Sequence, residues 1–478
     1  MRLLLTLSLL GSLSACSLTP TLERPAAPVP ASFPMASNAT ASTLPASAVG
    51  WRAMFGDPRL QRLIDLALVN NRDLRLATLN VQAAQAQANI QRAARLPAVG
   101  LEGARTRERT LSTDATGQTN REVNQQTGVG VALSAFELDL FGRVRALSDA
   151  AFARYLASEQ GRDAAQIALV GAVAEAYFAQ RLADEQLQLT ERTLADWQQS
   201  LELARLLKQA EQNSSLDVAQ AEGQVALAEA DLEARRRALA QADNALQLLV
   251  GSELPDDLPA ALPLERQPLI AQLPAGLPAD LLLNRPDLRQ AEQTLVAANA
   301  DIGAARAAFF PQISLTASFG HASTSLGGLF DPAQQVWRFV PQISQPLFHG
   351  GRLRGELHLA EVRKSEAVAQ YERTIQTAFR EVADALAGTA TYDRQIEAQL
   401  RAVNAAERRR TLSELRYRAG TDGRLELLDA QRQLQSTRQA LLELRRAEIA
   451  NRVALYKSLG GGLHERDRAA IAAATTAQ

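Results

Sequence analysis

The sequence contains a single cysteine in 478 residues, so no disulfide can form within one chain. Aromatic residues make up only 5% of it, which leaves few large rings to fill a globular core. The formal net charge is −1, and the arginine triplets at 235–237 and 408–410 lie in glutamate- and glutamine-rich runs typical of solvated helix faces. Without a basic field, nucleic acid is excluded as a partner. Alanine, leucine, glutamine, arginine and glutamate dominate instead, and these strong helix formers favour long, thin helices.

The one cysteine, Cys16, ends the N-terminal stretch MRLLLTLSLLGSLSAC. Arg2 supplies a positive charge, residues 3–10 form a short apolar run, and small residues precede the cysteine, as in a secretory signal. Leu-Ser-Ala-Cys resembles a bacterial lipobox, which implies cleavage after residue 15 and a lipid anchor on Cys16. Ser17 instead of aspartate then points to the outer membrane. The alternative is an ordinary signal peptide. Beyond Cys16 no apolar run approaches 18 residues, so we expect no transmembrane helix in the mature chain.

Prolines divide the chain, and the parts between them repeat. Aligning 70–97 with 284–311 gives twelve identities in 28 positions, and the match resumes downstream, where Gly251 faces Gly460. This pattern indicates a duplication with a loop insertion. The expected segments are a lipoprotein signal peptide (1–15), a lipid-anchored tether (16–57), a first repeat (58–251), a proline-rich linker (252–280), a second repeat (281–460) and a flexible C-terminal tail (461–478).

Each repeat contains two segments that alternate between apolar and polar residues. Ile313, Leu315 and Phe319 alternate with serine, threonine and glycine, which is the period of a strand with one apolar face. A strand of about ten residues crosses a bilayer when tilted, with lipid outside and water inside. A soluble antiparallel sheet has the same alternation, but the lipid anchor and the missing core aromatics favour the membrane. The strands are expected at about 98–106, 127–137, 312–320 and 337–346, with loops at 107–126 and 320–335.

Long helices are predicted around these strands. One helix precedes them in each repeat, at about 58–96 and about 286–310. Residues 143 to about 210 contain no proline, and an uninterrupted helix of that length reaches ~100 Å, too long for a compact domain. Leucine and alanine at three- and four-residue spacing favour coiled-coil packing. The long helices are expected to break at the polar turns 211–217 and 419–429, and their return helices to end at Gly251 and Gly460.

Four strands per chain cannot close a membrane-spanning sheet. Its open edges would leave backbone N–H and C=O groups unpaired in hydrocarbon, so neighbouring copies must complete the wall. Two chains supply eight strands and a barrel filled by side chains, whereas three supply twelve and room for a pore. The predicted fold class is mainly α with a transmembrane β-barrel, built from a duplicated helix–strand–strand–long helix–helix unit and continuing into a periplasmic helical tube.

Four long motifs carry a resemblance to a known family: WRAMFGDPRLQRLIDLAL (51–68), LLLNRPDLRQAEQTLVAANADIGAARAAFFPQISLT (281–316), QPLFHGGRLR (345–354) and YRAGTDGRLELLDAQRQL (417–434). The chain resembles the TolC-like outer membrane efflux proteins, in particular their OprM/NodT-type lipoprotein branch. The resemblance implies a homotrimer with a twelve-stranded β-barrel in outer membrane lipid, a periplasmic α-helical barrel and an equatorial belt. It also implies the exit duct of a tripartite efflux pump, whose partners are a periplasmic adaptor protein and an inner-membrane transporter of the resistance–nodulation–division (RND) type.

The turn at 419–429 holds the clearest candidate site. Asp422, Glu426 and Asp429 are spaced i, i+4 and i+7, which predicts one helix face and, in a trimer, three stacked rings of carboxylates. Such rings favour cations and narrow a pore electrostatically. The alternative is that these residues offset the helix macrodipole, with Asp422 as an N-cap.

Further residues enter this site through the resemblance and the repeat. The resemblance implies that Tyr417, Gly420 and Thr421 belong to the turn whose contacts hold the family's ducts closed. In the first repeat Asp217 occupies the position of Glu426. Glu211 stands where Gly420 would fall, so the geometry of the first turn is expected to differ.

Other functional classes find little support in the sequence. The four histidines show no metal spacing and no nucleophile motif is present, so we predict neither enzyme activity nor a metal or cofactor. A periplasmic coiled-coil adaptor should have one hairpin flanked by compact β-domains, which the duplicated unit argues against. Among ducts, the exit of a type I protein secretion system is the alternative function, and the lipobox favours the efflux pump.

Overall fold

The computed structural model describes residues 17–33, 46–113, 119–212, 214–270, 273, 278–419 and 421–465. They divide into two compact units. The sheet unit contains the described parts of residues 1–26, 80–158 and 290–371, and the helical unit contains those of residues 27–79, 159–289 and 372–478. No helix in the described ranges is both long enough and apolar enough to cross a membrane.

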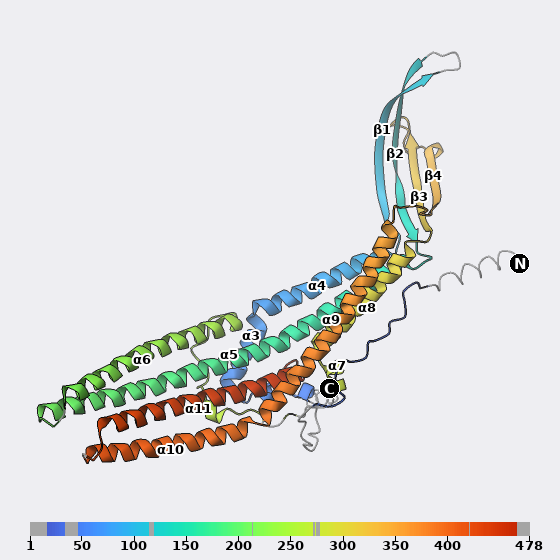
Figure 1. The fold of residues 1–478 in the computed structure, drawn as a ribbon. Coiled ribbons are helices and arrows are strands. Elements are labelled where there is room, and N and C mark those ends of the chain that lie inside the picture. Colours follow the sequence, from blue (N-terminus) through green and yellow to red (C-terminus); the bar gives the residue numbers. More distant parts are fainter. Residues whose placement is uncertain are drawn as a thin grey trace, which may run out of the picture. The chain divides into compact units, whose positions relative to one another are not determined.

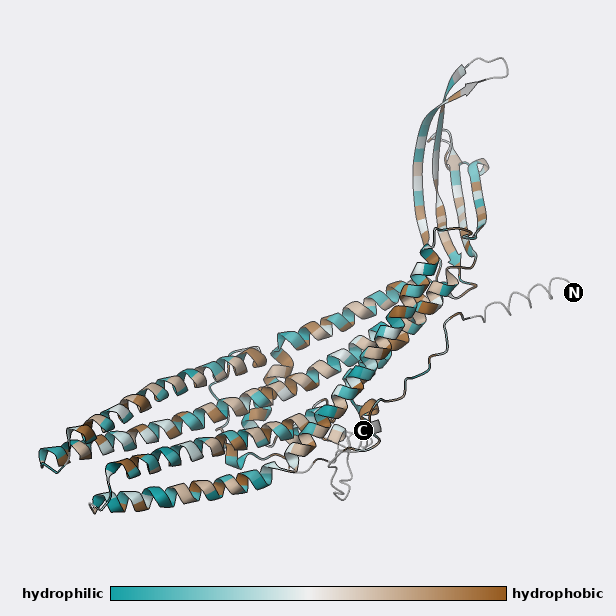
Figure 2. Ribbon diagram, viewed as in Figure 1, coloured by the Kyte–Doolittle hydropathy of each residue, from teal (hydrophilic) through white to brown (hydrophobic). Residues whose placement is uncertain are grey.

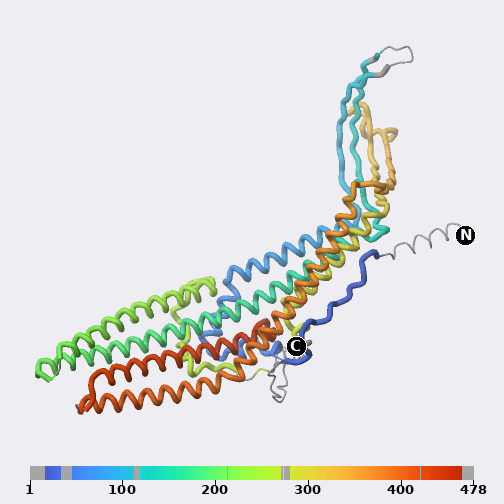
Figure 3. Tube along the Cα trace, in the orientation of Figure 1, coloured from blue at the N-terminus to red at the C-terminus, as the bar shows by residue number. Residues whose placement is uncertain are grey.

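The order of elements repeats in the two halves of the chain (Figures 1 and 3). The first half contains α3 (Pro58–Asn70), α4 (Arg72–Ala93), β1 (Val99–Thr113), β2 (Thr119–Leu138), α5 (Arg143–Gln209) and α6 (Ser215–Val250). The second half contains α7 (Pro278–Asn284), α8 (Pro286–Ala307), β3 (Gln312–Ser323), β4 (Gln335–Ser344), α9 (Arg352–Thr389), α10 (Tyr392–Arg418) and α11 (Arg424–Ser458). The short elements are η1 (Ala46–Ala48), α2 (Trp51–Met54), η2 (Leu264–Arg266) and η3 (Pro332–Gln334).

The four strands form one antiparallel sheet in the order β1-β2-β3-β4 (Figure 1). Its pairing register puts most of the large apolar residues of the four strands on one face, because directly opposed residues of antiparallel strands share a face. Val336 and Val340 of β4 lie on the other face. Hydrophobic and hydrophilic residues accordingly alternate along the strands in Figure 2. The opposite face carries mainly glycine, alanine, serine and threonine. Two rows of the apolar face are Leu101, Val131, Phe319 and Trp337, and Val99, Leu133, Ala317 and Phe339.

A bulge in β2 carries this apolar face on to the end of the strand at Leu138. The register between β2 and β3 shifts by one residue between Leu133 and Phe136, and Ala135 has a φ of 48°. The extra residue changes which positions point to each side of the sheet. As a result Phe136 and Leu138 lie on the same face as Leu133, although they are out of step with it in the sequence.

The loop predicted at 107–126 is wrong, because most of this stretch is strand. β1 and β2 stay paired from Arg107 opposite Gln125 to Thr113 opposite Thr119. β3 ends opposite Thr127, so among the described residues no third strand pairs with this part of the hairpin. Polar residues can therefore occupy both of its faces, and no apolar alternation marks the strand in the sequence.

Two helices predicted to be continuous are broken. The helix expected at 58–96 divides at Asn71, whose side-chain oxygen accepts a 2.9 Å hydrogen bond from the backbone N–H of Leu74 and so caps α4. The long helix expected before the 419–429 turn divides between α9 and α10. There Thr391 donates its hydroxyl to the carbonyl of Ala387, at 2.9 Å, and such side-chain bonds compete with the helical backbone.

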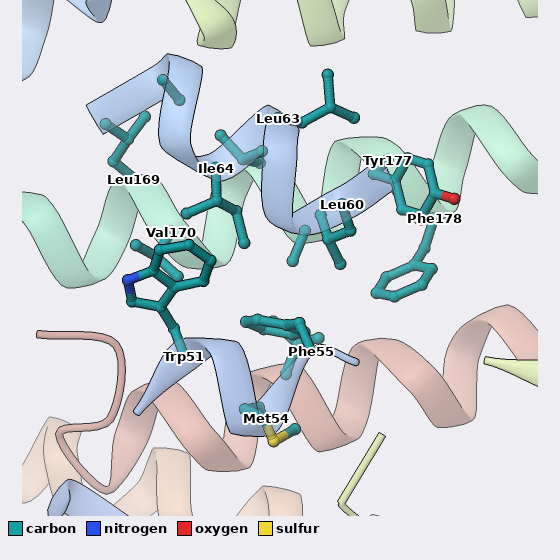
Figure 4. Packing of buried hydrophobic residues seen from close by; sticks show 14 of the residues in the cluster. Trp51, Met54, Phe55, Leu60, Leu63, Ile64, Leu169, Val170, Tyr177 and Phe178 are labelled. Carbon is teal, nitrogen blue, oxygen red and sulfur yellow. The ribbon is translucent and has the colours of Figure 1, made fainter. Parts of the chain in front are cut away.

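The core of the helical unit contains residues that were assigned to the tether. Trp51, Met54 and Phe55 are buried against α3 and α5 (Figure 4). A tether ending at residue 57 is therefore wrong, because these large apolar side chains are removed from water. Residues 461–465 do not form part of a free tail either, since His464 accepts a 2.9 Å hydrogen bond from the backbone N–H of Trp51. The rest of the predicted tail, 466–478, lies outside the described residues.

Both return helices end in a glycine that no other residue can replace without strain. Gly251 has a φ of 76° and Gly460 a φ of 83°, in the left-handed region. A Cβ at Gly251 would lie 2.6 Å from the carbonyl oxygen of Asn70, and one at Gly460 would lie 2.9 Å from that of Asn284. Asn70 and Asn284 are equivalent in the sequence alignment, so the duplication repeats this contact.

The predicted coiled-coil packing is present within each helical hairpin. Leu434 and Leu441 of α11 are buried with Val403 and Ala406 of α10. In the first half Leu201 and Ala204 of α5 pack with Val218 and Ala221 of α6. Alanine at these contacts lets the helix backbones approach closely.

Candidate functional site

The turn between α10 and α11 is closed by backbone contacts. The N–H of Ala419 donates to the carbonyl of Leu415, and Thr421 donates both its N–H and its hydroxyl to the carbonyl of Arg416, each at 3.0 Å. Gly420 lies outside the described residues. The N-cap of α11 is Gly423, with no side-chain cap.

Asp422 lies in this turn and not on the helix face predicted from the spacing. α11 begins only at Arg424, because Gly423 still has an extended backbone, with φ −71° and ψ 158°. The alternative role of Asp422 as an N-cap is also wrong, since Gly423 holds that position. The carboxylate of Asp422 instead accepts two hydrogen bonds from the Arg416 guanidinium, with N–O distances of 2.7 and 2.8 Å. This two-pronged pair joins the last turn of α10 to the loop.

Glu426 and Asp429 do lie on one face of α11, and both bind one arginine of α10. The Arg409 guanidinium donates to Glu426 Oε1 at 2.9 Å and to Asp429 Oδ2 at 2.7 Å. The hydrogen bonds to Glu426 and then to Asp429 raise the pKa of Arg409. Arg409 is the partner that the sequence reasoning missed: it is the middle residue of the 408–410 triplet, which was assigned to a solvated face.

These charged groups line an open groove of about 1360 Å³ between α6, α10 and α11. Leu227 of α6, Leu412 of α10 and Leu425 at the start of α11 also line it, and all three leucines are exposed. The groove therefore combines apolar contact area with the ion pairs of Asp422, Glu426 and Asp429. Such a surface can accept another helix.

Tyr417 belongs to a different face of the same hairpin. It lines a second groove, of about 480 Å³, with Leu203 and Leu206 of α5 and Leu427 of α11. The structure thus brings Glu426 and Asp429 together around Arg409 and leaves Tyr417 apart from them.

The corresponding turn between α5 and α6 has another geometry, as the sequence predicts. Glu211 adopts a left-handed φ of 61°. Ser214 caps α6, and Asp217 accepts a hydrogen bond from the N–H of Ser214 in return, which completes a capping box. Asp217, the repeat equivalent of Glu426, therefore stabilises a helix end.

The segment next to the predicted lipidation site runs along α8. Asn299 donates to the carbonyl of Pro20 at 2.7 Å, and Arg24 forms a 2.7 Å ion pair with Glu292. Thr19 lies directly against Gly303, where a Cβ would come within 2.1 Å of its hydroxyl oxygen. Cys16 itself lies outside the described residues. The chain that leads to it is held on the last turns of α8, close to the start of β3.

Over the described residues, no group of three or more histidine, cysteine, aspartate or glutamate side chains has the geometry to hold a metal ion.

Comparison with known proteins identifies the family. The family model for outer membrane efflux proteins matches residues 63–252 and 277–461. The chain belongs to this family. The solvent efflux pump outer membrane protein SrpC of Pseudomonas putida is 47% identical over 458 residues, which cover 94% of this chain and 96% of SrpC. Outer membrane protein OprJ of Pseudomonas aeruginosa is 44% identical over 459 residues, which cover 95% of this chain and 94% of OprJ.

Solved structures agree with this assignment. The open state of the Neisseria gonorrhoeae MtrE outer membrane channel matches with a TM-score of 0.85 at 38% identity, over 95% of this chain and 100% of MtrE. This outer membrane efflux protein therefore has the TolC-like fold. It is the outer membrane exit duct of a tripartite efflux pump, and its family consists of transport channels, not enzymes.

Proposed function

We propose that three copies of this chain form one duct, in which twelve strands close a wall through the outer membrane and the helices enclose a periplasmic tube. The observation that carries this proposal is the apolar face of the sheet. Leu101, Trp337 and Ile343 on that face are 79%, 75% and 69% exposed. Lipid is the environment in which such a face is stable.

The edges of the sheet support the assembly of several copies. In the part of the chain that the structure describes, β1 and β4 each pair with one strand only, so each presents an edge of backbone N–H and C=O groups that no further strand covers. In hydrocarbon these groups need partners, and a neighbouring copy supplies them when its β4 pairs with β1. Three copies leave a lumen wide enough for cargo, whereas the interior of an eight-stranded barrel is filled by side chains.

Disulfide cross-linking tests this arrangement. Three double-cysteine variants are made in a Cys16→Ala background. Each has Gly100→Cys on β1, combined with Arg338→Cys, Val340→Cys or Gln342→Cys on β4. At least one pair is expected to give a covalent trimer under oxidising conditions, and native mass spectrometry to give three times the chain mass. A matched control pairs Gly100→Cys with Gln220→Cys on α6. A monomer or dimer by mass, with no trimer cross-link from any pair, would falsify the proposal.

The proposed protein partners are the other two components of a tripartite efflux pump. The duct meets a periplasmic adaptor protein and an inner-membrane transporter of RND type at the α5–α6 and α10–α11 turns. The groove with exposed Leu227, Leu412 and Leu425 supports docking of an apolar helix there.

Because SrpC is a solvent efflux protein by name, apolar organic compounds are the proposed cargo. Expression in a host that lacks its own duct, together with an RND transporter and its adaptor, should restore solvent tolerance. Restored secretion of a type I protein substrate without solvent tolerance would favour the alternative.

Cys16 is the proposed attachment point of the lipid anchor. The contacts of residues 19–24 with α8 support this, because they hold the chain close to the strands that enter the membrane. Radiolabelled palmitate should be incorporated into the wild type and absent from Cys16→Ala. Label that persists in the variant would exclude this cysteine.

The α10–α11 turn is the proposed gate of the duct, with carboxylate rings formed by Asp422, Glu426 and Asp429. Tyr417, Gly420 and Thr421 complete the turn whose contacts hold the closed state. In planar bilayers the double variant Asp422→Ala with Asp429→Ala should lower cation selectivity and raise the open probability. If both properties stay at the wild-type values, these carboxylates are not a gate.

A further inference from the structure

The hairpin of β1 and β2 continues beyond the rest of the sheet. β3 ends at Ser323, opposite Thr127, while β1 and β2 stay paired as far as Thr113 and Thr119. Four arginines, which we call the arginine ladder, lie at the start of this two-stranded extension and along it: Arg105 in the last row that still includes β3, and Arg107, Arg109 and Arg121 beyond it.

The register puts the whole arginine ladder on one face of the hairpin. Arg105, Arg107 and Arg109 follow Leu101 at even spacing on β1, so they share its face. Arg121 lies opposite Leu111, which belongs to the same series. The ladder is therefore a direct continuation of the apolar face that lies in lipid under the proposed function.

The carboxylates of the extension lie on the other face. Glu108 and Glu122 occupy the alternate positions of β1 and β2, opposite Asn124 and Thr110. All four arginines of the ladder are exposed, and among the described residues none forms an ion pair. The hairpin thus separates its charges, with unneutralised guanidinium groups on the lipid side and carboxylates on the lumen side.

With Leu101 taken as the outer edge of the hydrocarbon, the ladder begins just above the layer of lipid headgroups. Arg105 is four residues beyond Leu101, or about 13 Å along the strand and about 10 Å in height for a tilt of about 40°. Headgroup layers add about 5–8 Å to each side of the hydrocarbon. The flexible arginine side chains of Arg105 and Arg107 can reach into that layer, and Arg109 and Arg121 extend beyond it.

We infer that the arginine ladder binds the phosphate groups of the lipid headgroups that surround the duct in the outer leaflet. The inference rests on the proposed membrane insertion. A guanidinium group can donate two parallel hydrogen bonds to two oxygens of one phosphate. Because the ladder continues the apolar face, the anion nearest to it is the phosphate of the surrounding lipid. In a trimer the three ladders form a belt of twelve arginines that fixes the depth of the barrel.

Binding of bis-phosphorylated lipid A tests the ladder. Full-length, delipidated protein in detergent is titrated with lipid A, and binding is followed by thermophoresis. Replacing all four ladder arginines by glutamine should weaken binding by at least about tenfold, and replacing them by lysine should weaken it less. The matched control replaces Arg72, Arg75, Arg236 and Arg237 of α4 and α6 by glutamine, which removes the same charge and should leave binding unchanged.

Two further arms identify the source of the phosphate. Dephosphorylated lipid A should bind the wild type as weakly as lipid A binds the glutamine variant, and millimolar inorganic phosphate should not compete. Equal binding by wild type and glutamine variant, or full binding of dephosphorylated lipid, overturns the inference. Native mass distinguishes the two proposals: a trimeric, pump-competent glutamine variant with unchanged lipid binding refutes only the ladder, whereas a monomeric wild type refutes the duct.

Discussion

The hydroxyl of Tyr177 on α5 donates a 2.6 Å hydrogen bond to the carboxylate of Asp57, and both residues are buried. The other oxygen of Asp57 accepts a 2.8 Å hydrogen bond from the N–H of Arg59 and caps α3. Asp57 therefore fixes the start of α3 on α5, in the core shown in Figure 4.

Replacing Tyr177 by phenylalanine should destabilise the helical unit by about 1–3 kcal/mol. The substitution leaves one oxygen of a buried carboxylate without its donor, and the desolvation cost of that oxygen is no longer offset. Thermal unfolding followed by circular dichroism measures the loss. Tyr392→Phe, at the partly exposed start of α10, is the matched control and should stay within about 0.5 kcal/mol of the wild type.

The same pair predicts a dependence of stability on alkaline pH. Burial, followed by the hydrogen bond to Asp57, raises the pKa of Tyr177 above its ordinary value of about 10. Above about pH 10 the unfolded chain releases the phenol proton of Tyr177 while the folded chain retains it, so the free energy of unfolding falls as pH rises. The decline between about pH 10 and 11.5 should be steeper in the wild type than in Tyr177→Phe. Parallel curves for the two proteins would contradict this coupling.

Alanine at Gly251 or Gly460 should destabilise the protein by at least about 2 kcal/mol. Both positions have a left-handed backbone, and the new Cβ would press on the carbonyl of Asn70 or Asn284. Gly223→Ala on α6 is the control, because no described atom beyond its own stretch of helix backbone lies within 4 Å of the added Cβ. Helix propensity should make that variant slightly more stable, and a comparable loss in all three would point to a cause other than strain.

Replacing Arg409 by glutamine should increase the preference of the duct for cations. The change removes the donor that binds Glu426 and Asp429 and leaves two carboxylates without their counter-charge. Reversal potentials in a salt gradient measure the permeability ratio. Arg408→Gln removes the same charge from the neighbouring position, where no ion pair is formed within the described part of the chain. Equal shifts for both variants would show that net charge, and not the pair, sets selectivity.

Arginine at Phe339 should prevent assembly in the outer membrane, whereas arginine at Val340 should be tolerated. The two positions are neighbours on β4 and point to opposite faces of the sheet. A charge on the lipid face costs about 2–4 kcal/mol per chain near the bilayer midplane, and one on the lumen face is hydrated. The amount of trimer in outer membrane fractions measures the difference, and equal amounts would mean that the apolar face does not meet lipid.

Periodic features of the sequence predicted the repeated part of the fold well. The alternation that begins at Ile313 predicted the apolar face, and proline-free runs ending in a polar turn predicted the helical hairpins. Such patterns are local, since each residue reports the environment imposed by its own helix or strand. In the described part of residues 107–126 neither face of the strands is regularly buried. The sequence there has no apolar alternation, so the strands could not be predicted.

Contacts between distant segments were the part that could not be predicted. Trp51 and Phe55 follow a proline-rich stretch, and their burial against α5 depends on residues more than a hundred positions away. In the sequence Arg409 is one of three adjacent arginines that resemble a solvated helix face. Its ion pairs with Glu426 and Asp429 form only because α11 packs against α10. The sequence indicated which residues are candidates for the gate, but it could not show that Tyr417 and Asp429 lie in separate grooves.

The sequence by itself determined the duplicated element order, the apolar face of the strands and the left-handed helix ends, because backbone geometry imposes these through near neighbours. Only the tertiary structure decided which charges form pairs, where the tether ends and which face receives the arginine ladder. Those outcomes depend on strand register and helix packing, which join residues that are far apart in the chain.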